Sequence, residues 1–367
     1  MKRMILWSGL FLATMYSYPQ GRYRSADTDL NEPRLNAQQV EMIVPIMSQF
    51  AQNTQFAMAL IDAGEIMFFG LERDGDKVVS VPNEDSVFEI GSLSKVFTTH
   101  LMMNLVKEEK ISLGDPIADY LDFPLKGNPR ITFGQLASHH SGLPYYPSNL
   151  GMLLFKQDNP FGDYSQEKFE KFLTHQLKLK SVPGEKYTYS NVGMALLGYT
   201  LGKLTQESYE KALQEEIFLP LHMTQSSSNK QAVEAHIVQG RNKRGNPMHN
   251  WDLGALEGAG AILSSVKDLS QYAVFSFDAL QGDLALMKER YGEVDALMDI
   301  AMGWHIIKEE GKASFLWHNG GTGGYKSSMA IAPDRKDAVI ILSNVGADEP
   351  DRRQVDELCF RLMKSIE

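Results

Sequence analysis

The sequence holds a single cysteine, Cys359, among its 367 residues. One thiol cannot form a disulfide within the chain, and it excludes zinc and redox sites that need several cysteines. The residues around it, 357–363, place apolar side chains at helical spacing. We therefore interpret Cys359 as a buried helix residue rather than as a catalytic thiol.

Basic residues are also outnumbered. The chain has 36 Lys and Arg against 46 Asp and Glu, which gives a formal net charge of −10. An acidic chain repels phosphate backbones, so we expect no nucleic acid as a partner. Hydrophobic residues make up 43% and charged residues 22%, which is typical of globular proteins and excludes a disordered chain, a collagen and a coiled coil. At roughly 150 residues per domain, the length favours about two domains.

Long hydrophobic runs are absent beyond the N-terminal segment, so no stable transmembrane anchor is expected there. The N-terminal apolar run, 4–15, is itself shorter than the roughly 20 residues that cross a bilayer. It follows Lys2 and Arg3, an arrangement typical of a signal peptide. We therefore predict a signal peptide over 1–18 and an exported protein, periplasmic or secreted. Because no Ala-x-Ala cleavage site follows, an apolar helix docked on the folded body is the alternative.

Strand-like segments occur near both ends of the chain. Residues 19–35 are polar and contain prolines, which predicts a linker. Short apolar or alternating runs predict strands at 56–61, 65–69, 304–307, 314–317, 326–331 and 338–342. Helical spacing of apolar residues predicts helices at 37–52, 92–110 and 351–366.

This order of elements predicts an α+β fold. Both chain ends would build one antiparallel sheet, flanked by helices, because strand signals return only late in the sequence. The sheet domain would comprise 36–110 and 300–367. A mainly helical domain, 111–299, would be a large insertion between these two parts.

Ser92 and Lys95 are the first candidates for chemistry. A spacing of three places both side chains on one helix face, where the lysine can help remove the serine proton. The spacing alone is weak, because the chain has five such serines: Ser92, Ser165, Ser208, Ser227 and Ser264. Only Ser92 follows a strand-like run and a glycine and begins a long apolar-striped helix, whose free N–H groups favour an oxyanion. The alternative is that Ser92 is a plain N-cap.

A second candidate segment contains Tyr189 and Asn191, the only Tyr-x-Asn in the chain. A tyrosine beside a lysine can accept and donate a proton. Asn191 could hydrogen-bond a substrate amide. The alternative is a turn that precedes a buried helix.

A third candidate is the glycine-rich run 318–324, which begins with His318 and follows a strand-like segment. Its glycines allow the backbone to approach a ligand closely. The run lacks the arrangement of a phosphate-binding loop that opens a helix, so no nucleotide cofactor is expected. His139 and His140 are adjacent and lack a second histidine at helical spacing or a carboxylate cluster, so no metal is expected either.

The three elements, in this order, resemble those of the serine β-lactamase and penicillin-binding protein superfamily. Their flanking residues resemble the class C-like branch, which includes class C β-lactamases, D-Ala-D-Ala carboxypeptidases, D-aminopeptidases and esterases. The segments that carry the resemblance are 88–95, 131–144, 187–193 and 317–325. The similarity covers roughly 37–365, and it implies the β-lactamase/transpeptidase fold.

The resemblance also implies a role for each candidate. Ser92 resembles the nucleophile that forms an acyl-enzyme, and Lys95 resembles the residue that activates it. Tyr189 resembles the general acid/base, and Asn191 resembles the residue that orients the substrate amide. The N–H groups of Ser92 and Gly321 would form the oxyanion hole.

The strand motif departs from the β-lactamases. His318 stands where those enzymes carry the lysine of Lys-Thr-Gly, and Gly320 and Gly321 follow it in the substrate-binding strand. Histidine is mostly neutral near pH 7 and would bind a β-lactam carboxylate less well. Tyr145, Tyr146 and the loop 256–260 are expected to share the pocket wall.

The expected function is therefore hydrolysis of an amide or ester by a serine hydrolase that forms an acyl-enzyme. The substrate would be a D-amino-acid peptide, as for a D-Ala-D-Ala carboxypeptidase, or a related ester. One alternative is a class C-type β-lactamase. An alternative of another class is a catalytically silent penicillin-binding or sensor protein.

Overall fold

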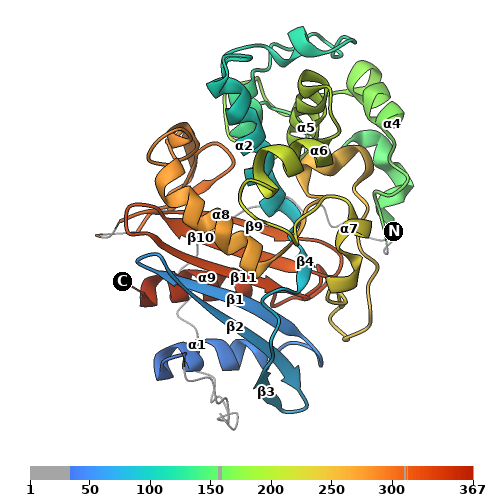
Figure 1. The fold of residues 1–367 in the computed structure, drawn as a ribbon. Coiled ribbons are helices and arrows are strands. Elements are labelled where there is room, and N and C mark those ends of the chain that lie inside the picture. The colour runs from blue at the N-terminus through green and yellow to red at the C-terminus, as the bar shows by residue number, and fades with distance from the viewer. Residues whose placement is uncertain (1–33, 156–158, 310, 312, 367) are drawn as a thin grey trace.

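The computed structural model describes residues 34–155, 159–309, 311 and 313–366. The predicted signal peptide and all but the end of the predicted linker lie outside these residues. Within them, the largest feature is a nine-stranded antiparallel sheet with the order β3-β2-β1-β11-β10-β9-β8-β7-β6 (Figure 1). Its strands are β1 Gln55–Asp62, β2 Glu65–Asp74, β3 Lys77–Ser80, β6 Gly292–Asp295, β7 Met298–Ile300, β8 His305–Ile307, β9 Phe315–Gly321, β10 Lys326–Ala332 and β11 Asp337–Ser343.

Strands from the two chain ends are neighbours inside this sheet. β1 pairs with β11 in antiparallel register, with Phe56 opposite Ser343. Both strands are buried on both faces, which explains their continuous apolar sequences. In Figure 1 they lie side by side, blue beside red. A second sheet of two strands pairs β4 Val87–Glu89 with β5 Leu263–Ser265.

Helices cover both faces of the large sheet. α1 Ala37–Met47 and α9 Gln354–Ser365 pack against each other and cover one face, where they enclose an apolar core with alternate residues of the strands. Cys359 is fully buried in α9, as interpreted from the sequence. α8 Val266–Ala279 lies over β1 and β11 on the other face (Figure 1).

The rest of the chain is mainly helices and short turns. Its α-helices are α2 Ser94–Lys107, α3 Phe133–Ala137, α4 Gln166–Lys171, α5 Asn191–Thr205, α6 Tyr209–Leu213 and α7 Lys230–Val233. Tighter or wider helical turns are η1 Gly91–Leu93, η2 Ile117–Tyr120, η3 Ser148–Phe155, η4 Phe172–Gln176, η5 Gln214–Phe218, η6 Glu234–His236, η7 Gly254–Ala259 and η8 Ala285–Met287. α5 packs closely on η7, and α2 packs on both.

The predicted α+β fold with an antiparallel sheet built from both chain ends is confirmed. Sequence patterns do not reveal β3, β6 and β7, because each of these short strands mixes a charged residue with its apolar ones. β6 and β7 enter the sheet before the predicted boundary at 300, and the division into two domains stays a prediction.

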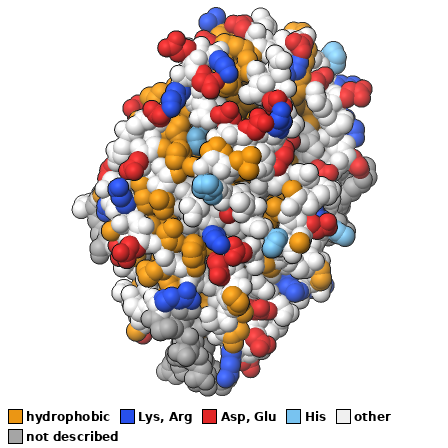
Figure 2. Space-filling model, in the orientation of Figure 1, with side chains coloured by type: hydrophobic (Ala, Val, Ile, Leu, Met, Phe, Trp, Pro, Cys, Tyr) orange, Lys and Arg blue, Asp and Glu red, His pale blue; other side chains and the backbone are white. Residues whose placement is uncertain are grey.

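Acidic and basic side chains are interspersed on the face of the molecule that Figure 2 shows. No helix in the described part of the chain is long and apolar enough to cross a membrane. The same residues contain no group of three or more His, Cys, Asp or Glu that could hold a metal ion.

Candidate active site

Ser92 lies in the short turn η1, directly before α2, rather than within the α-helix that the sequence predicts. Its side chain caps neither helix, so the N-cap alternative is wrong. Gly91 before it has a φ of 52°, a conformation that favours glycine. A Cβ at Gly91 would lie 2.6 Å from the backbone N of Gly321. The lack of a side chain therefore lets the end of β9 approach the serine turn.

Lys95 is fully buried one turn further along. Its Nζ lies 2.9 Å from Ser92 Oγ and donates to the Ala259 carbonyl oxygen at 2.6 Å. Burial lowers the pKa of the Lys95 amine well below its usual range, because the charged form loses its solvation. The amine is therefore poised to accept the serine proton.

The other four Ser-x-x-Lys serines have structural partners instead. Ser165 and Ser208 are N-caps of α4 and α6. Ser227 donates to Glu210, and the hydroxyls of Ser264 and Ser226 lie 2.8 Å apart. Among these five serines, only Ser92 hydrogen-bonds to the side-chain amine of its lysine.

Tyr189 lies beside the Ser92–Lys95 pair. Lys95 Nζ is 5.0 Å from the centroid of the Tyr189 ring. Burial raises the pKa of the Tyr189 phenol well above its usual range, and the hydrogen bond with the Ser92 hydroxyl acts in the opposite direction. Tyr189 therefore keeps its proton at neutral pH, next to the hydroxyl that Lys95 would deprotonate.

The segment before α5 is held by the loop 139–145. Ser190 is the N-cap of α5, and its backbone N–H donates to His139 Nδ1. Its hydroxyl donates to the Pro144 carbonyl oxygen at 2.7 Å. Asn191, the first residue of α5, donates its backbone N–H to the Tyr145 carbonyl oxygen. These bonds fix the segment that carries Tyr189 and Asn191 to the loop 139–145.

The end of β9 forms the opposite side of the site. His318 is buried, and its Nδ1 lies 2.7 Å from the Asn319 carbonyl oxygen. Burial, with smaller contributions from His305 and Lys95, lowers the pKa of His318 well below its usual range, so its imidazole is neutral. A Cβ at Gly320 would lie 1.8 Å from the Ile90 carbonyl oxygen, so a glycine is needed for this close packing.

A cavity connects these elements. It is lined by Gly91, Ser92, Tyr145, Tyr146, Phe161, Asn191, Trp251, Leu253, Leu256, Ala259, Gly260, Gly321 and Thr322. Among the predicted site residues, Ser92, Asn191 and Gly321 line it directly, and Lys95 and Tyr189 contact Ser92. His318 and Gly320 precede Gly321 in β9 but do not line this cavity. The predicted wall residues Tyr145 and Tyr146 also line it.

Sequence reasoning did not name five of the lining residues: Gly91, Phe161, Trp251, Leu253 and Thr322. Phe161 and Trp251 pack edge to face, with ring centroids 5.1 Å apart, although the two segments are distant in the sequence. Two of the five were within reach of the sequence: Gly91 directly precedes Ser92, and Thr322 lies inside the candidate run 318–324.

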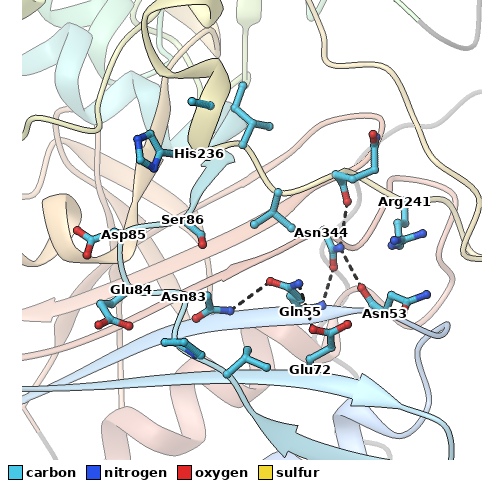
Figure 3. A pocket seen from close by; sticks show the side chains of 16 residues that line it. Asn53, Gln55, Glu72, Asn83, Glu84, Asp85, Ser86, His236, Arg241 and Asn344 are labelled. Atoms are coloured by element: carbon cyan, nitrogen blue, oxygen red, sulfur yellow. Dashed lines mark hydrogen bonds between the residues drawn. The ribbon is translucent and has the colours of Figure 1, made fainter.

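Figure 3 shows a second and larger cavity, of about 570 Å³, near β1 and β2. Its polar side chains hydrogen-bond one another. Gln55 donates its backbone N–H to Asn344 Oδ1 at 2.7 Å, its Oε1 accepts from Asn83 Nδ2, and its Nε2 donates to Glu72. This arrangement indicates a structural polar network rather than a catalytic pair, so the smaller cavity at Ser92 is the candidate active site.

Comparisons with known proteins agree with this geometry. The Beta-lactamase family model matches residues 51–360. The D-alanyl-D-alanine-carboxypeptidase/endopeptidase AmpH of Escherichia coli (strain K12) is 25% identical over 91% of this chain and 89% of its own length. Protein flp of Staphylococcus aureus (strain COL) is 22% identical over 85% of this chain and 64% of its own length.

A solved structure shows the same fold. The octameric penicillin-binding protein homologue from Pyrococcus abyssi superposes with a TM-score of 0.69 and 24% identity, over 87% of this chain and 73% of that one. Because the family model matches most of the chain, the resemblance expected from the sequence is confirmed. The protein belongs to the beta-lactamase family and is a serine hydrolase.

Proposed function

We propose that Ser92 is the nucleophile of an acyl-transfer reaction on a D-amino-acid peptide or a related ester. The observation that carries this proposal is the 2.9 Å contact between Ser92 Oγ and the amine of Lys95. That amine is fully buried, and burial lowers its pKa, which favours the neutral form that a base requires. The peptide substrate is supported by the name of AmpH, a carboxypeptidase and endopeptidase.

Acylation would then proceed as follows. Lys95 Nζ takes the Ser92 hydroxyl proton while Oγ bonds to the substrate carbonyl carbon, and the carbonyl oxygen becomes an oxyanion. The backbone N–H groups of Ser92 and Gly321 bind this oxyanion. Tyr189 gives its proton to the leaving amine or alcohol as the bond to carbon breaks, and the Lys95 ammonium returns a proton to Tyr189. Water hydrolyses the acyl-enzyme through the reverse transfers.

The cavity wall supports an apolar or aromatic acyl portion. Tyr145, Tyr146, Phe161 and Trp251 supply four aromatic rings around it. Asn191 is buried at the base of this wall and has an amide group that can orient a substrate amide. Because the His318 imidazole is neutral, it offers no positive charge to a substrate carboxylate, which favours an ester or an internal peptide bond over a substrate whose binding depends on a free carboxylate.

We also propose that the protein is exported and works in the periplasm or outside the cell. The basic residues Lys2 and Arg3 and the apolar run 4–15 support this location. Cell fractionation tests it: the protein should appear in the periplasmic or extracellular fraction, and residence in the cytosol alone would contradict it.

The function is tested by assaying three substrate types with purified protein: a peptide ending in D-Ala-D-Ala, a cross-linked cell-wall peptide and a chromogenic ester. We expect hydrolysis of at least one of them by the wild type and none by a folded Ser92→Ala variant. Ser165→Ala is the matched control, since Ser165 has the same spacing to a lysine but caps a surface helix. Turnover that survives Ser92→Ala would refute the assignment of the nucleophile.

A further inference from the structure

Glu89 is a buried carboxyl group close to the catalytic turn. It is the last residue of β4, three positions before Ser92, and only 4% of it is exposed. Its Oε1 accepts a hydrogen bond from the backbone N–H of Trp251 at 2.7 Å. Its Oε2 is buried and has no hydrogen-bond partner within the described residues. Burying a carboxyl group costs free energy of folding unless neighbouring groups hydrogen-bond to it or compensate its charge.

The groups around Glu89 belong to the walls of the active-site cavity. Trp251 and Thr322 both line that cavity, and Thr322 directly follows Gly321. The Thr322 hydroxyl lies beside the Glu89 carboxyl, as does the side chain of Asn250. Thr322 is only 2% exposed, and its hydroxyl is also without a conventional hydrogen-bond partner in the described chain.

Asn250 connects the cluster of Glu89, Trp251 and Thr322 to the buried Tyr325. Its Nδ2 donates to the Tyr325 hydroxyl at 2.9 Å. The same hydroxyl donates to the Val238 carbonyl oxygen at 2.7 Å and accepts from the Gly240 N–H. The cluster therefore joins three parts of the fold: the strand that leads to Ser92, the end of β9 and the loop that carries Trp251.

The charge on Glu89 depends on pH in the neutral range. Burial raises the pKa of Glu89 to about 7, and Thr322, Asn250, the Trp251 N–H and the charge on Lys230 act in the opposite direction. A protonated carboxyl can donate to the Thr322 hydroxyl, whereas a carboxylate can only accept. Ionisation would also place a negative charge beside Thr322, the residue that follows Gly321.

We propose that Glu89 is a positioning residue for acylation, which holds Trp251 and Thr322 in place and thereby sets the Gly321 amide opposite Ser92. This inference rests on the proposed function, in which that amide binds the oxyanion. Glu89 acts best when uncharged, because a carboxylate near Gly321 opposes the negative charge that develops on the substrate oxygen.

The first test is the dependence of kcat/KM on pH for a chromogenic ester whose hydrolysis requires Ser92. The wild type should lose activity as the pH rises through about 7. Glu89→Gln keeps an acceptor for Trp251 but cannot ionise, so it should retain wild-type activity at low pH within about threefold and lack this loss. Glu84→Gln is the matched control on the same segment, and it should leave the profile unchanged. A Glu89→Gln profile identical to that of the wild type would overturn the proposal.

The second test does not depend on turnover. The tryptophan fluorescence of the wild type should change with a midpoint near pH 7, and this transition should vanish in Glu89→Gln and in Trp251→Phe. A transition that persists in Glu89→Gln, or none in the wild type, would contradict the role of Glu89 even if no substrate were found. Conversely, loss of all hydrolysis with the fluorescence transition intact would count against the proposed function and not against the link between Glu89 and Trp251.

Discussion

Replacing Lys95 by arginine or by methionine separates two roles that this residue could play beside Ser92. As a base, Lys95 must exist as a neutral amine, and burial lowers its pKa in the direction that favours this form. Arginine keeps a permanent positive charge and cannot accept a proton near neutral pH. Methionine has a similar length and no charge. If Lys95 is the base, both variants should be inactive, whereas a purely electrostatic role would leave Lys95→Arg active.

The size of the effect follows from the contacts of the amine. Loss of a positioned general base typically lowers the rate by about 100- to 10,000-fold, or roughly 3–5 kcal/mol in the barrier. Removing the amine also leaves the Ala259 carbonyl oxygen without its 2.6 Å donor, which should cost about 1–3 kcal/mol of folding stability. Lys95→Met should therefore unfold at a lower temperature than the wild type. Lys95→Arg should do so as well, because its permanent charge is placed in a fully buried site.

The assay measures initial rates of peptide or ester hydrolysis over a range of pH, with circular dichroism to verify folding. Ser92→Ala sets the background rate. A folded Lys95→Arg or Lys95→Met variant that retains more than about a tenth of the wild-type kcat/KM would refute the role of Lys95 as the base.

Three further predictions test other parts of the site. Tyr189→Phe keeps the ring beside Lys95 but removes the phenolic proton. Amide hydrolysis should therefore fall about 100-fold or more, and hydrolysis of an ester with a good leaving group should fall less. Equal losses on both substrates would contradict the role of Tyr189 as the acid that protonates the leaving group. Gly91→Ala places a Cβ 2.6 Å from the Gly321 nitrogen at a φ of 52°, so thermal unfolding should show a loss of at least 1–2 kcal/mol; an unchanged melting temperature would count against the close approach of β9. Because burial raises the pKa of Glu89 from 4.5 to about 7, the folded state holds more protons between these two values, and this group should lower the free energy of unfolding by up to about 3 kcal/mol as the pH rises through them. Urea unfolding of Glu89→Gln should show a decrease that is smaller by this amount, since Glu257 has a similarly raised pKa and still contributes.

The sheet could be predicted because its central strands have an unambiguous signal. The segments around Phe56 and Val339 are short, apolar and bounded by turns, and the structure pairs them at the centre of the sheet. Burial on both faces forces such composition, so local sequence is informative there. β6 and β7 have three or four residues and are defined by pairing, since β6 pairs with β7 and β7 pairs with β8.

The candidate site was predictable to the extent that its groups are close in sequence. Ser92 and Lys95 are one helical turn apart, and Asn191 follows Tyr189 by two residues. The contact of Phe161 with Trp251 depends on how distant loops pack, and no local pattern encodes it. Glu89 is a charged residue at the end of an otherwise apolar strand. That pattern indicates either a strand at the edge of a sheet or a buried carboxyl group with a function, and it could have identified Glu89 from the sequence.

The central claim is that an acyl group becomes bonded to Ser92 Oγ during turnover. Intact-protein mass spectrometry tests it most directly, after acid quenching of brief reactions with a chromogenic ester and, separately, with a penicillin. We predict a mass increase equal to the acyl group, located by peptide mapping on the peptide that contains Ser92 and absent from Ser92→Ala. An adduct on a different residue, or consumption of the ester by Ser92→Ala at the wild-type rate, would contradict the account.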